Sequence, residues 1–309
     1  MVCVSGVLVT GASGFIGGHL SRRLVRAGAE VHGVSRRPRE IEGVRWWQAD
    51  LSDAAAAAEL VRSVRPERIF HLAGLTSGSR DLDEVLPVLR DNLVATVGLL
   101  VEAARSDCEL VLMAGSLEEP QGATGEFVPT SPYAAAKEAA GSFARMLAAL
   151  HDLKVVNLRV FMTYGPGQRA PKIVPSVVGS LLRGERPKLT SGRRAVDWIH
   201  VDDVVDAFLA AADRPDLAGE TLDVGSGELV TIRSLVELIV ELMGSELEPE
   251  FGAIPDRPLE TVRAADTERT RALLGWSPKT TLRSGLRATI GWCRAEAAEL
   301  AVEEAAVER

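Results

Sequence analysis

The 309-residue sequence lacks the patterns typical of membrane-spanning and nucleic-acid-binding proteins. It has no run of about 18 apolar residues, which a transmembrane helix would need. Its apolar start leads directly into a glycine-rich turn instead of a signal-peptide cleavage site, which predicts a cytoplasmic protein without membrane contact. The net charge is −8 and there is no long basic tract, so nucleic acid is not an expected partner.

Cysteine and histidine are also sparse. The three cysteines, Cys3, Cys108 and Cys293, lie far apart and form no CxxC pair, and the five histidines are scattered. Disulfide frameworks and zinc sites require these residues at close, regular spacing. We therefore expect reduced thiols and no metal site.

What the sequence does contain is the composition of a soluble globular enzyme, with 46% hydrophobic and 25% charged residues. Short β-branched apolar runs alternate with longer helical patterns, which predicts βαβ units and a parallel α/β sheet. The runs are apolar throughout, as expected for strands that helices cover on both faces. The expected strands are 7–10, 31–34, 68–71, 110–113 and 155–160, and the expected helices between them are 14–27, 54–64, 81–105 and 132–150.

The first expected strand runs into a GxxGxxG motif at a strand-to-helix junction. Such a turn presents backbone N–H groups and a helix N-terminus to a pyrophosphate, and its glycines allow close approach. The motif therefore predicts a dinucleotide site, although glycines before a helix can also serve packing alone. The predicted cofactor residues of this turn are Gly11, Ser13, Gly14, Phe15, Ile16 and Gly17.

The second expected strand ends without the acidic residue that usually holds the adenosine 2′-hydroxyl in such sites. Ser35, Arg36 and Arg37 stand there instead. Arginine suits a 2′-phosphate, which favours NADP over NAD, whereas solvated surface arginines are the alternative interpretation. Asp50, followed by Leu51, comes after a third strand and is expected either to contact adenine or to cap the next helix.

Beyond Tyr164 the pattern changes, because GPGQRAPKIVP interrupts the alternation with two glycines and three prolines. We therefore expect a dinucleotide-binding domain over 1–164 and 200–226 and a substrate-binding lobe over 165–199 and 227–309. Later helices are expected near 175–183, 201–212, 231–243 and 282–294, with strands near 196–200 and 221–224. The Glu- and Ala-rich stretch 297–309 is expected to be a frayed, solvated tail.

A tyrosine and a lysine carry the clearest resemblance to a known family. Tyr133 and Lys137 are four residues apart on one face of an expected helix, and Ser116 ends the strand before it. Together with GASGFIG at 11–17 and FHLAG at 70–74, these residues resemble the extended short-chain dehydrogenase/reductase family, the NAD-dependent epimerase/dehydratase group. Further landmarks are Asn92, GPG at 165–167, DWIHVDDV at 197–204 and LGWSP at 274–278.

The resemblance implies a Rossmann-type, doubly wound parallel sheet with a smaller, mixed C-terminal substrate lobe. It also implies an NAD(P)-dependent reaction on a nucleotide-diphosphate sugar, and a homodimer formed through the helices that start at Asp81 and Pro132. Tyr133 would be the acid/base, and Ser116 would donate a hydrogen bond to the substrate. Lys137 would favour the ionised form of Tyr133 and bind the ribose of the cofactor. Further implied contacts are Leu72, Ala73 and Gly74 with the cofactor and Thr76 with the substrate.

Two positions, Leu117 and Met162, depart from the family pattern. Glu118 matches a glutamate that can abstract the C5 proton in sugar-nucleotide dehydratases, but Leu117 stands before it, so a second acid is missing. Gly-Ser-Leu-Glu-Glu also resembles the Gly-Ser-x-Glu-Glu of nucleotide-sugar 4-ketoreductases; exposed loop glutamates are the alternative. Met162 stands where many family epimerases have an asparagine that contacts the substrate diphosphate. Arg257 resembles a phosphate-binding arginine of the family and is the remaining candidate for this contact; a salt bridge within its loop is the alternative.

Three functions therefore stay open. The family favours a 4-epimerase or 4,6-dehydratase that retains one cofactor and transfers hydride at a sugar carbon, C4. The Gly-Ser-x-Glu-Glu segment and the arginines at 36 and 37 favour an NADPH-dependent 4-ketoreductase of an NDP-4-keto-6-deoxyhexose. A non-catalytic, dinucleotide-sensing regulator is the third, but it would not need to keep Ser116, Tyr133 and Lys137.

Overall fold

The computed structural model describes residues 6–37, 40–76, 78–119, 128–260 and 262–307, with side chains in the last helix up to residue 299. The chain divides into two units. Unit 1 comprises Met1–Phe161, Val204–Val224 and Asp266–Ser277, and unit 2 comprises Met162–Asp203, Gly225–Ala265 and Pro278–Arg309. Within the described residues, no helix is long and apolar enough to cross a membrane.

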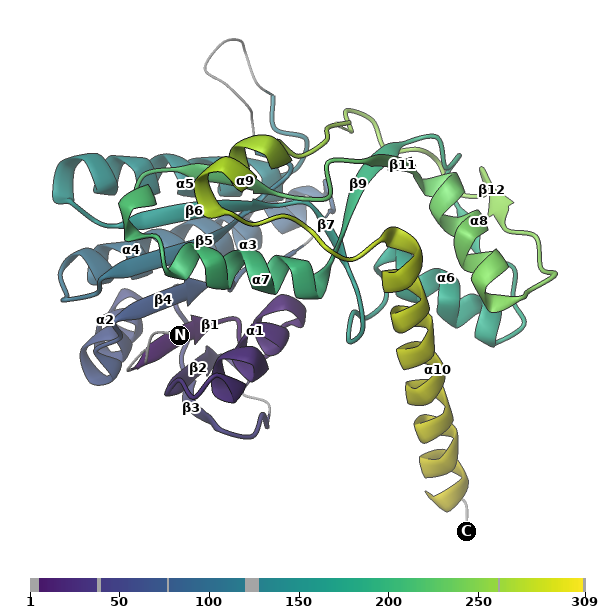
Figure 1. Cartoon of the computed structure of the whole chain (residues 1–309), viewed down its shortest axis with the longest axis horizontal. Coiled ribbons are helices and arrows are strands. Elements are labelled where there is room, and N and C mark those ends of the chain that lie inside the picture. Colours follow the sequence, from purple (N-terminus) through teal and green to yellow (C-terminus); the bar gives the residue numbers. More distant parts are fainter. Residues whose placement is uncertain (1–5, 38–39, 77, 120–127, 261, 308–309) are drawn as a thin grey trace. The chain divides into compact units, whose positions relative to one another are not determined.

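Unit 1 is built on a seven-stranded sheet in the order β10-β6-β5-β4-β1-β2-β3, in which all pairs are parallel (Figure 1). The strands are β1 (Val7–Thr10), β2 (Val31–Ser35), β3 (Val44–Gln48), β4 (Arg68–His71), β5 (Leu110–Ser116), β6 (Val155–Val160) and β10 (Thr221–Val224). The central strands are almost entirely buried, as their continuous apolar sequence predicts. The predicted Rossmann-type α/β sheet is therefore confirmed.

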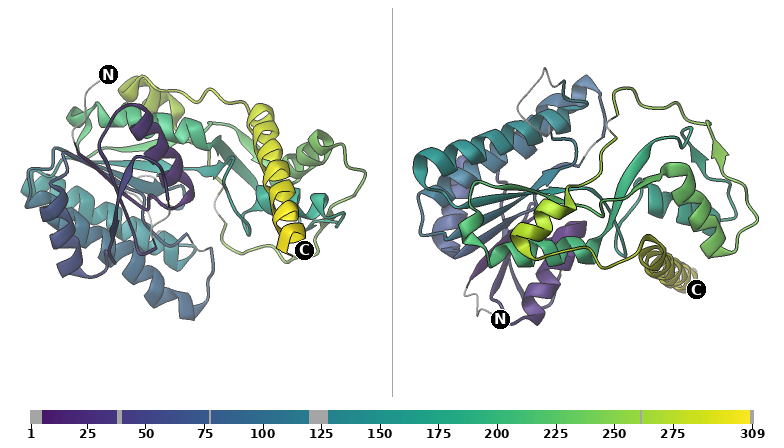
Figure 2. Two further views of the ribbon diagram at one scale, coloured as in Figure 1. Left: turned by 90° about the horizontal axis from the view of Figure 1, so that it is seen from below. Right: turned by 45° about the horizontal axis from the view of Figure 1, so that its top comes forward.

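Helices cover both faces of this sheet (Figure 2). Helices α2 (Ala54–Val64), α4 (Ala95–Ala104) and α5 (Pro132–His151) pack side by side on one face. Helices α1 (Phe15–Arg26) and α7 (Val201–Ala212) lie on the other face and are joined by the ion pair between Arg23 and Asp206. The short helix η3 (Pro215–Leu217) precedes β10, and α9 (Thr267–Leu274) packs against β10.

The long helix expected over 81–105 is instead divided into four pieces. The pieces are η1 (Leu82–Glu84), α3 (Val85–Val88), η2 (Leu89–Val94) and α4, and η2 is a π-helical turn. Such turns insert one extra residue per turn and recur at functional sites. In this turn the side chain of Asn92 is completely buried.

The chain reverses its direction of strand addition between β1 and β4. From β1 the sheet grows through β2 to β3, and from β4 it grows the other way, through β5 and β6 to β10. The loops that leave β1 and β4 are therefore the pair that can open a crevice at the carboxyl edge of the sheet. Ligands of open α/β sheets bind in such a crevice, so we expect the ligand site at this edge of the sheet.

Unit 2 is smaller and mixed. Strand β9 (Ala195–His200) pairs in parallel with β7 (Met162–Tyr164) and antiparallel with β11 (Leu229–Thr231), and β8 (Lys188–Leu189) pairs with β12 (Glu250–Phe251). Helices α6 (Ile173–Leu182), α8 (Ile232–Met243) and α10 (Leu282–Val307) pack against one another. Their buried faces enclose a separate core that includes Trp198, Leu235 and Leu286.

Two parts of the C-terminal region differ from expectation. The tail expected to fray from residue 297 is helical through Val307, because its Ala and Glu residues are strong helix formers that extend α10; residues 308–309 lie outside the described residues. Residues 266–277, which the sequence assigned to the lobe, belong to unit 1. There the Thr270 hydroxyl donates to the carbonyl of Asp223 on β10 at 2.7 Å.

Candidate active site

The glycine-rich turn between β1 and α1 has the close backbone packing that a pyrophosphate site requires. Gly11 has a φ of +67°, and a Cβ there would lie 2.8 Å from the backbone nitrogen of Ala73. A Cβ at Gly17 would lie 2.2 Å from the carbonyl oxygen of Gly11. Gly14 begins α1 without a side-chain cap, so the first N–H groups of the helix have no side-chain acceptor. The turn therefore fits a phosphate group both by space and by donors.

Ser35, Arg36 and Arg37 lie at the end of β2, next to this turn. The Ser35 hydroxyl lies 2.8 Å from the hydroxyl of Ser13 and shares a hydrogen bond with it. Both arginines are exposed, but the Arg36 guanidinium is ion-paired with Asp91 at 2.9 Å. The positive charge at this strand end is therefore partly neutralised by the protein itself.

Asp50 lies at the end of β3 and forms a local turn. Its carboxylate accepts the hydroxyl of Ser52 at 2.7 Å and the N–H of Ser52 at 3.0 Å, and these bonds lower the pKa of Asp50. The cap of α2 is Asp53, which accepts the N–H of Ala55 at 2.9 Å. The alternative role of Asp50 as that cap is therefore wrong, and its contact with adenine stays a prediction.

A buried chain of hydrogen bonds links β1, β4 and the π-helical turn. Nδ1 of His71 lies 2.8 Å from the Thr10 hydroxyl, and its Nε2 lies 2.8 Å from the Thr96 hydroxyl. Thr96 donates to the carbonyl of Asn92, whose side-chain amide bonds both the N–H and the carbonyl of Leu75 at 2.6 and 3.0 Å. Burial lowers the pKa of His71 to about 3, so this imidazole is neutral at physiological pH.

The three side chains predicted to be catalytic come together at the carboxyl edge of the sheet. Helix α5 starts at the N-cap Ser131, whose hydroxyl accepts a hydrogen bond from the first turn at 3.1 Å, and this fixes the position of Tyr133. The Lys137 ammonium donates to the carbonyl of Ala114 at 2.7 Å and lies 5.9 Å from the centre of the Tyr133 ring. The hydroxyl of Ser116, the last residue of β5, hydrogen-bonds to Tyr133.

The segment after β4 approaches the same group. A Cβ at Gly74 would lie 3.0 Å from Oδ1 of Asn92 and 3.9 Å from Nζ of Lys137. The two preceding residues, Leu72 and Ala73, donate their N–H groups to the Thr10 hydroxyl at 3.1 Å. Gly74 is thus packed beside the lysine, and a larger residue there would displace the amide or the ammonium.

Burial sets the charge states of the tyrosine and the lysine. It raises the pKa of the Tyr133 hydroxyl above its ordinary value; the hydrogen bond with Ser116 opposes this, and the charges of Glu118 and Glu119 add to it. Burial lowers the pKa of the Lys137 ammonium, and the charge of Glu119 opposes this. The protein alone therefore holds Tyr133 as a neutral phenol, which is the form that donates a proton.

Glu118 lies beside Ser116, at the edge of this group of side chains. It is half-buried, and its carboxylate accepts hydrogen bonds from the hydroxyls of Ser131 at 3.0 Å and Thr130 at 3.4 Å. Its N–H donates to the Ser116 hydroxyl at 3.2 Å. The structure thus places Glu118 beside the predicted catalytic serine, although its role as a base stays a prediction.

Glu119 lies behind the same group and is only 6% exposed. Its carboxylate accepts the N–H of Ser116 at 2.7 Å and a side-chain N–H of Asn157 on β6 at 2.9 Å. The interpretation of both glutamates as exposed loop residues is therefore wrong, because neither is exposed and Glu119 is folded into the protein interior.

The remaining predicted site residues are dispersed. Thr76 is exposed on the segment after β4, Phe15 and Ile16 are half-buried in the first turn of α1, and Leu51 is buried. Arg257 is exposed in unit 2, on the segment between β12 and α9. The contacts predicted for these residues with cofactor and substrate stay predictions. Of the cysteines, Cys108 and Cys293 are free thiols, and Cys3 lies outside the described residues.

A comparison with protein families decides the affiliation. The model of the NAD dependent epimerase/dehydratase family matches residues 7–225, which include the glycine turn and the group around Tyr133. The chain belongs to this family. The family predicted from the sequence is thereby confirmed, and with it the prediction that the chain is an NAD(P)-dependent enzyme.

Similar family members cover almost the whole chain. A UDP-glucose 4-epimerase of Mycolicibacterium smegmatis is 33% identical over 93% of this chain and 98% of its own. A dTDP-glucose 4,6-dehydratase of the same organism is 30% identical over 94% of this chain and 93% of its own. The solved structure of MoeE5 in complex with UDP-glucose and NAD is 33% identical, with a TM-score of 0.84 and coverage of 94% and 99%. A UDP-glucose 4-epimerase from Thermotoga maritima with UDP-glucose is 26% identical, with a TM-score of 0.87 and the same coverage.

Several residues of the site were missed by reasoning from the sequence. No role was expected for His71, Glu119 or Asn157, and Asn92 was only a landmark. A signal was nevertheless present, because a histidine at the end of β4 and an asparagine inside β6 are polar residues directly beside the buried apolar residues of these strands. Such residues are almost always hydrogen-bonded when buried, so they indicate a polar network near the sheet.

Proposed function

We propose that the chain interconverts epimers of a nucleoside-diphosphate hexose by reversible hydride transfer at C4, with Tyr133 as the acid/base. The observation that carries this proposal is the convergence of Ser116, Tyr133 and Lys137 beside the glycine turn, all within unit 1. Two relatives at 30% identity or more, the mycobacterial epimerase and MoeE5, carry UDP-glucose in their names or complexes, which supports a UDP-hexose as substrate.

Each side chain has a distinct task in this reaction. A nicotinamide cofactor held at the glycine turn would supply the hydride acceptor and donor, so that C4 of the sugar could be oxidised to the ketone and reduced again on its other face. Tyr133 is a neutral phenol in the protein alone, and the positive charges of Lys137 and of a bound nicotinamide would favour its phenolate. The phenolate takes the proton of the C4 hydroxyl as the hydride leaves and donates it back as the hydride returns. Ser116 donates a hydrogen bond to the same oxygen, and the Lys137 charge stabilises the phenolate. Such proton transfer contributes about 10² to 10⁴ in rate.

Epimerisation is favoured over 4,6-dehydration by what surrounds Glu118. Dehydration needs a second acid beside the base, and the preceding residue Leu117 is apolar and only 9% exposed. The Glu118 carboxylate itself already accepts hydrogen bonds from two hydroxyls. The 4,6-dehydratase and the NADPH-dependent 4-ketoreductase are therefore the alternative activities that the experiment must distinguish from epimerisation.

The glycine turn is suited to NAD. Cβ atoms at Gly11 and Gly17 would collide with backbone atoms, so only glycine allows the close turn that binds the pyrophosphate of a dinucleotide. NAD is present in the solved complex of MoeE5. The preference for NADP stays a prediction that rests on Ser35, Arg36 and Arg37. The ion pair of Arg36 with Asp91 weakens that preference, because part of the charge that would attract a 2′-phosphate is already compensated.

A homodimer through the helices near Asp81 and Pro132 is the proposed assembly. Large apolar side chains are at least a third exposed on η1, α3, η2 and α5, which pack against one another. They are Leu82, Val85, Leu86, Leu89, Val94, Phe143, Met146 and Leu150. Exposed apolar side chains that gather on neighbouring helices are typical of protein–protein contacts. Light scattering of the purified protein should give twice the chain mass, and a monomer at micromolar concentration would contradict the dimer.

The test starts with the nucleotide that the purified protein carries. Denaturation followed by mass spectrometry should release near-stoichiometric NAD(H), as expected for a cofactor that is regenerated in every cycle. The same preparation should convert UDP-glucose to UDP-galactose without added cofactor. Freely exchanging NADPH with reduction of a 4-keto-6-deoxy sugar would instead establish the ketoreductase, and elimination of water from dTDP-glucose would establish the dehydratase.

A further inference from the structure

Glu119 and Asn157 form a buried pair behind the catalytic group. The two side chains are 6% and 4% exposed, and they come from the loop after β5 and from the middle of β6. One carboxylate oxygen of Glu119 accepts the N–H of Ser116, and the other accepts the side-chain N–H of Asn157. Because both oxygens accept hydrogen bonds from N–H donors, the contacts fit the ionised carboxylate.

Gly115 leaves the room for this pair, and Gly141 packs against it. A Cβ at Gly115 of β5 would lie 2.6 Å from Glu119 and 2.5 Å from Asn157, closer than any real contact. On the opposite side, a Cβ at Gly141 of α5 would lie 3.8 Å from Glu119 and 3.6 Å from Asn157. Gly141 follows Tyr133 and Lys137 at intervals of four residues, so the helical face that carries the catalytic side chains continues over the buried carboxylate.

The charges around Glu119 come from several elements. Lys137 on α5 and Arg159 on β6 both oppose the rise in the pKa of Glu119 that burial causes. A third cation, Arg145 on α5, has its guanidinium 3.5 Å from the Gly141 Cβ position, which lies 3.8 Å from the Glu119 carboxylate. Arg159 is also ion-paired with Asp223 of β10 at 3.0 Å. The other ionisable groups near Lys137 are Tyr133, Glu118 and the neutral His71. Among the residues that the structure describes, Lys137 belongs to no ion pair, and Glu119 is the acid whose charge opposes the effect of burial on its ammonium.

We propose that Glu119 is a positioning residue of the active site, which fixes the backbone of Ser116 and supplies the buried negative charge that keeps the Lys137 ammonium protonated. The inference rests on the proposed function only in taking Tyr133 and Lys137 as the catalytic pair. Glu119 touches the catalytic serine from behind and acts on the chemistry through Ser116 and Lys137.

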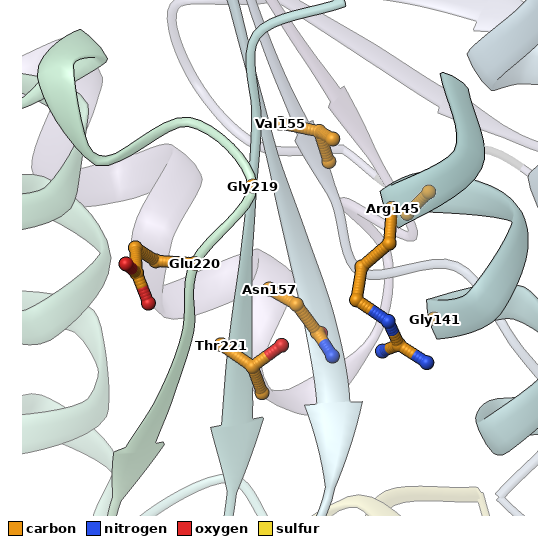
Figure 3. A pocket seen from close by; sticks show the side chains of 8 residues that line it. Gly141, Arg145, Val155, Asn157, Gly219, Glu220 and Thr221 are labelled. Atoms are coloured by element: carbon orange, nitrogen blue, oxygen red, sulfur yellow. The ribbon is translucent and has the colours of Figure 1, made fainter. Parts of the chain in front are cut away.

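The surroundings of Asn157 make a neutral replacement of Glu119 feasible. Asn157 lines a small pocket together with Arg145 and Thr221, between α5 and the β6–β10 edge of the sheet (Figure 3). Its Oδ1 has no hydrogen-bond partner among the described residues. In Glu119→Gln the new carbonyl can accept the N–H of Ser116, and the new amide can donate to Oδ1 once the Asn157 side chain turns over. The variant therefore keeps the shape and removes only the charge.

The direct test measures the pKa of Lys137 in the protein as purified, without added substrate. The chain has only five lysines, so ¹³Cε-lysine NMR gives few signals, and Lys137→Arg identifies the one that matters. E119Q should lower the pKa of Lys137 by about one unit, because a neighbouring negative charge is lost. Glu138→Gln, the half-buried neighbour of Lys137 in sequence, is the matched control and should leave this pKa within about 0.3 units. An unchanged Lys137 titration in folded E119Q would overturn the proposal.

Two further measurements separate charge from structure and do not depend on the folding of E119Q. Asn157→Leu removes a hydrogen bond of the pair but keeps the charge, so the pKa of Lys137 should not fall. A fall of about one unit in this variant would mean a merely structural role. In the wild type, the Lys137 signal should also shift in the acid range, where Glu119 takes up a proton. This shift should persist in Glu118→Gln, and its absence there would contradict the coupling.

Enzyme kinetics provides the link to catalysis. Removing a negative charge lowers the pKa of every nearby group, so both limbs of the pH profile of kcat/KM should move to lower pH in E119Q, by about one unit. The Lys137 titration needs no turnover, so the two proposals fail separately. A protein that converts no nucleotide sugar would contradict the proposed function, whereas a normal Lys137 titration and an unshifted profile in E119Q would contradict only the role of Glu119.

Discussion

The two units each bury a carboxylate, but they satisfy it in different ways. Asp197 in unit 2 is 1% exposed and accepts four hydrogen bonds, from the N–H and hydroxyl of Ser226 at 2.7 Å and the N–H groups of Gly227 and Ala265 at 2.9 Å. Glu119 in unit 1 accepts one backbone N–H and one side-chain amide and lies near charged groups. The first arrangement ties three chain segments together, whereas the second leaves a charge that acts on its neighbours.

The two tyrosines of the chain repeat this difference. Tyr164 in unit 2 is 1% exposed, donates to the carbonyl of Leu282 at 3.3 Å, and meets the ring of His200 edge-on. Tyr133 in unit 1 has a serine hydroxyl and a lysine beside it. The tyrosine of unit 2 thus bonds a backbone carbonyl, and that of unit 1 lies beside groups that can exchange protons. Stability should suffer most from changes in unit 2, and activity from changes in unit 1.

The largest expected effect is on turnover, and it should separate the two tyrosines. Tyr133→Phe removes the proton donor and should lower kcat at least about 10²-fold, with nucleotide binding retained. Tyr164→Phe removes one hydrogen bond in unit 2, so it should cost about 1 kcal/mol of unfolding free energy while turnover stays within about twofold. Steady-state kinetics and urea unfolding of both variants provide the comparison. Equal turnover in the wild type and Tyr133→Phe would remove Tyr133 from the mechanism.

The second largest effect is expected on the stability of unit 2. In Asp197→Asn the new amide group faces N–H donors, and at least one of them loses its acceptor. The variant should therefore lose about 3 kcal/mol of unfolding free energy. Glu119→Gln is the matched variant in unit 1 and should lose less, because Asn157 can turn to accept the new amide. If both variants lost the same stability, the contrast between the two carboxylates would be wrong.

The third effect is a dependence of stability on pH that arises in unit 1. Burial depresses the pKa of His71 to about 3, below the ordinary value near 6.5 that it has in the unfolded chain. The stabilisation that depends on a neutral His71 is therefore fully present above about pH 6.5 and is lost as the pH falls towards 3. Between pH 7.5 and pH 5 the free energy of unfolding should fall by about 2 kcal/mol because of this residue.

His71→Gln keeps a side chain that can hydrogen-bond but cannot titrate, so it is the control for this dependence. Urea unfolding at pH 7.5 and pH 5 should show the loss in the wild type to exceed that in the variant by about 2 kcal/mol. Identical losses in the two proteins would mean that His71 is not held neutral by the fold.

The smallest effect concerns the choice of cofactor. Asp91→Asn should free the Arg36 guanidinium and raise the affinity for NADP relative to NAD about fivefold, because an exposed ion pair is worth at most about 1 kcal/mol. The matched control is Glu241→Gln, which breaks the exposed ion pair with Arg283 in unit 2 and should not change the ratio. Calorimetric titration with both dinucleotides measures it. A ratio unaffected by Asp91→Asn would show that Arg36 lies away from the 2′-position.

Much of unit 1 was predictable because local pattern and tertiary environment agree there. Continuous β-branched runs became buried parallel strands, and the glycine motif became the turn between β1 and α1. The Tyr133–Lys137 spacing placed both side chains on one face of α5. The long helix from residue 81 was less predictable, since its π-helical turn depends on Asn92 reaching the backbone of Leu75.

The sequence by itself determined the fold class and the family, and it singled out Ser116, Tyr133 and Lys137 as the predicted catalytic trio, because helix periodicity, strand composition and motif spacing are local properties. Only the tertiary structure decided what happens to charges. It turned Glu119, next to Glu118 in sequence, into a buried group beside Asn157, 38 residues further on, and it paired Arg36 with Asp91. Such pairs join residues from different strands and helices. Burial and the approach of partners set their energies, and neither can be read from the neighbouring sequence.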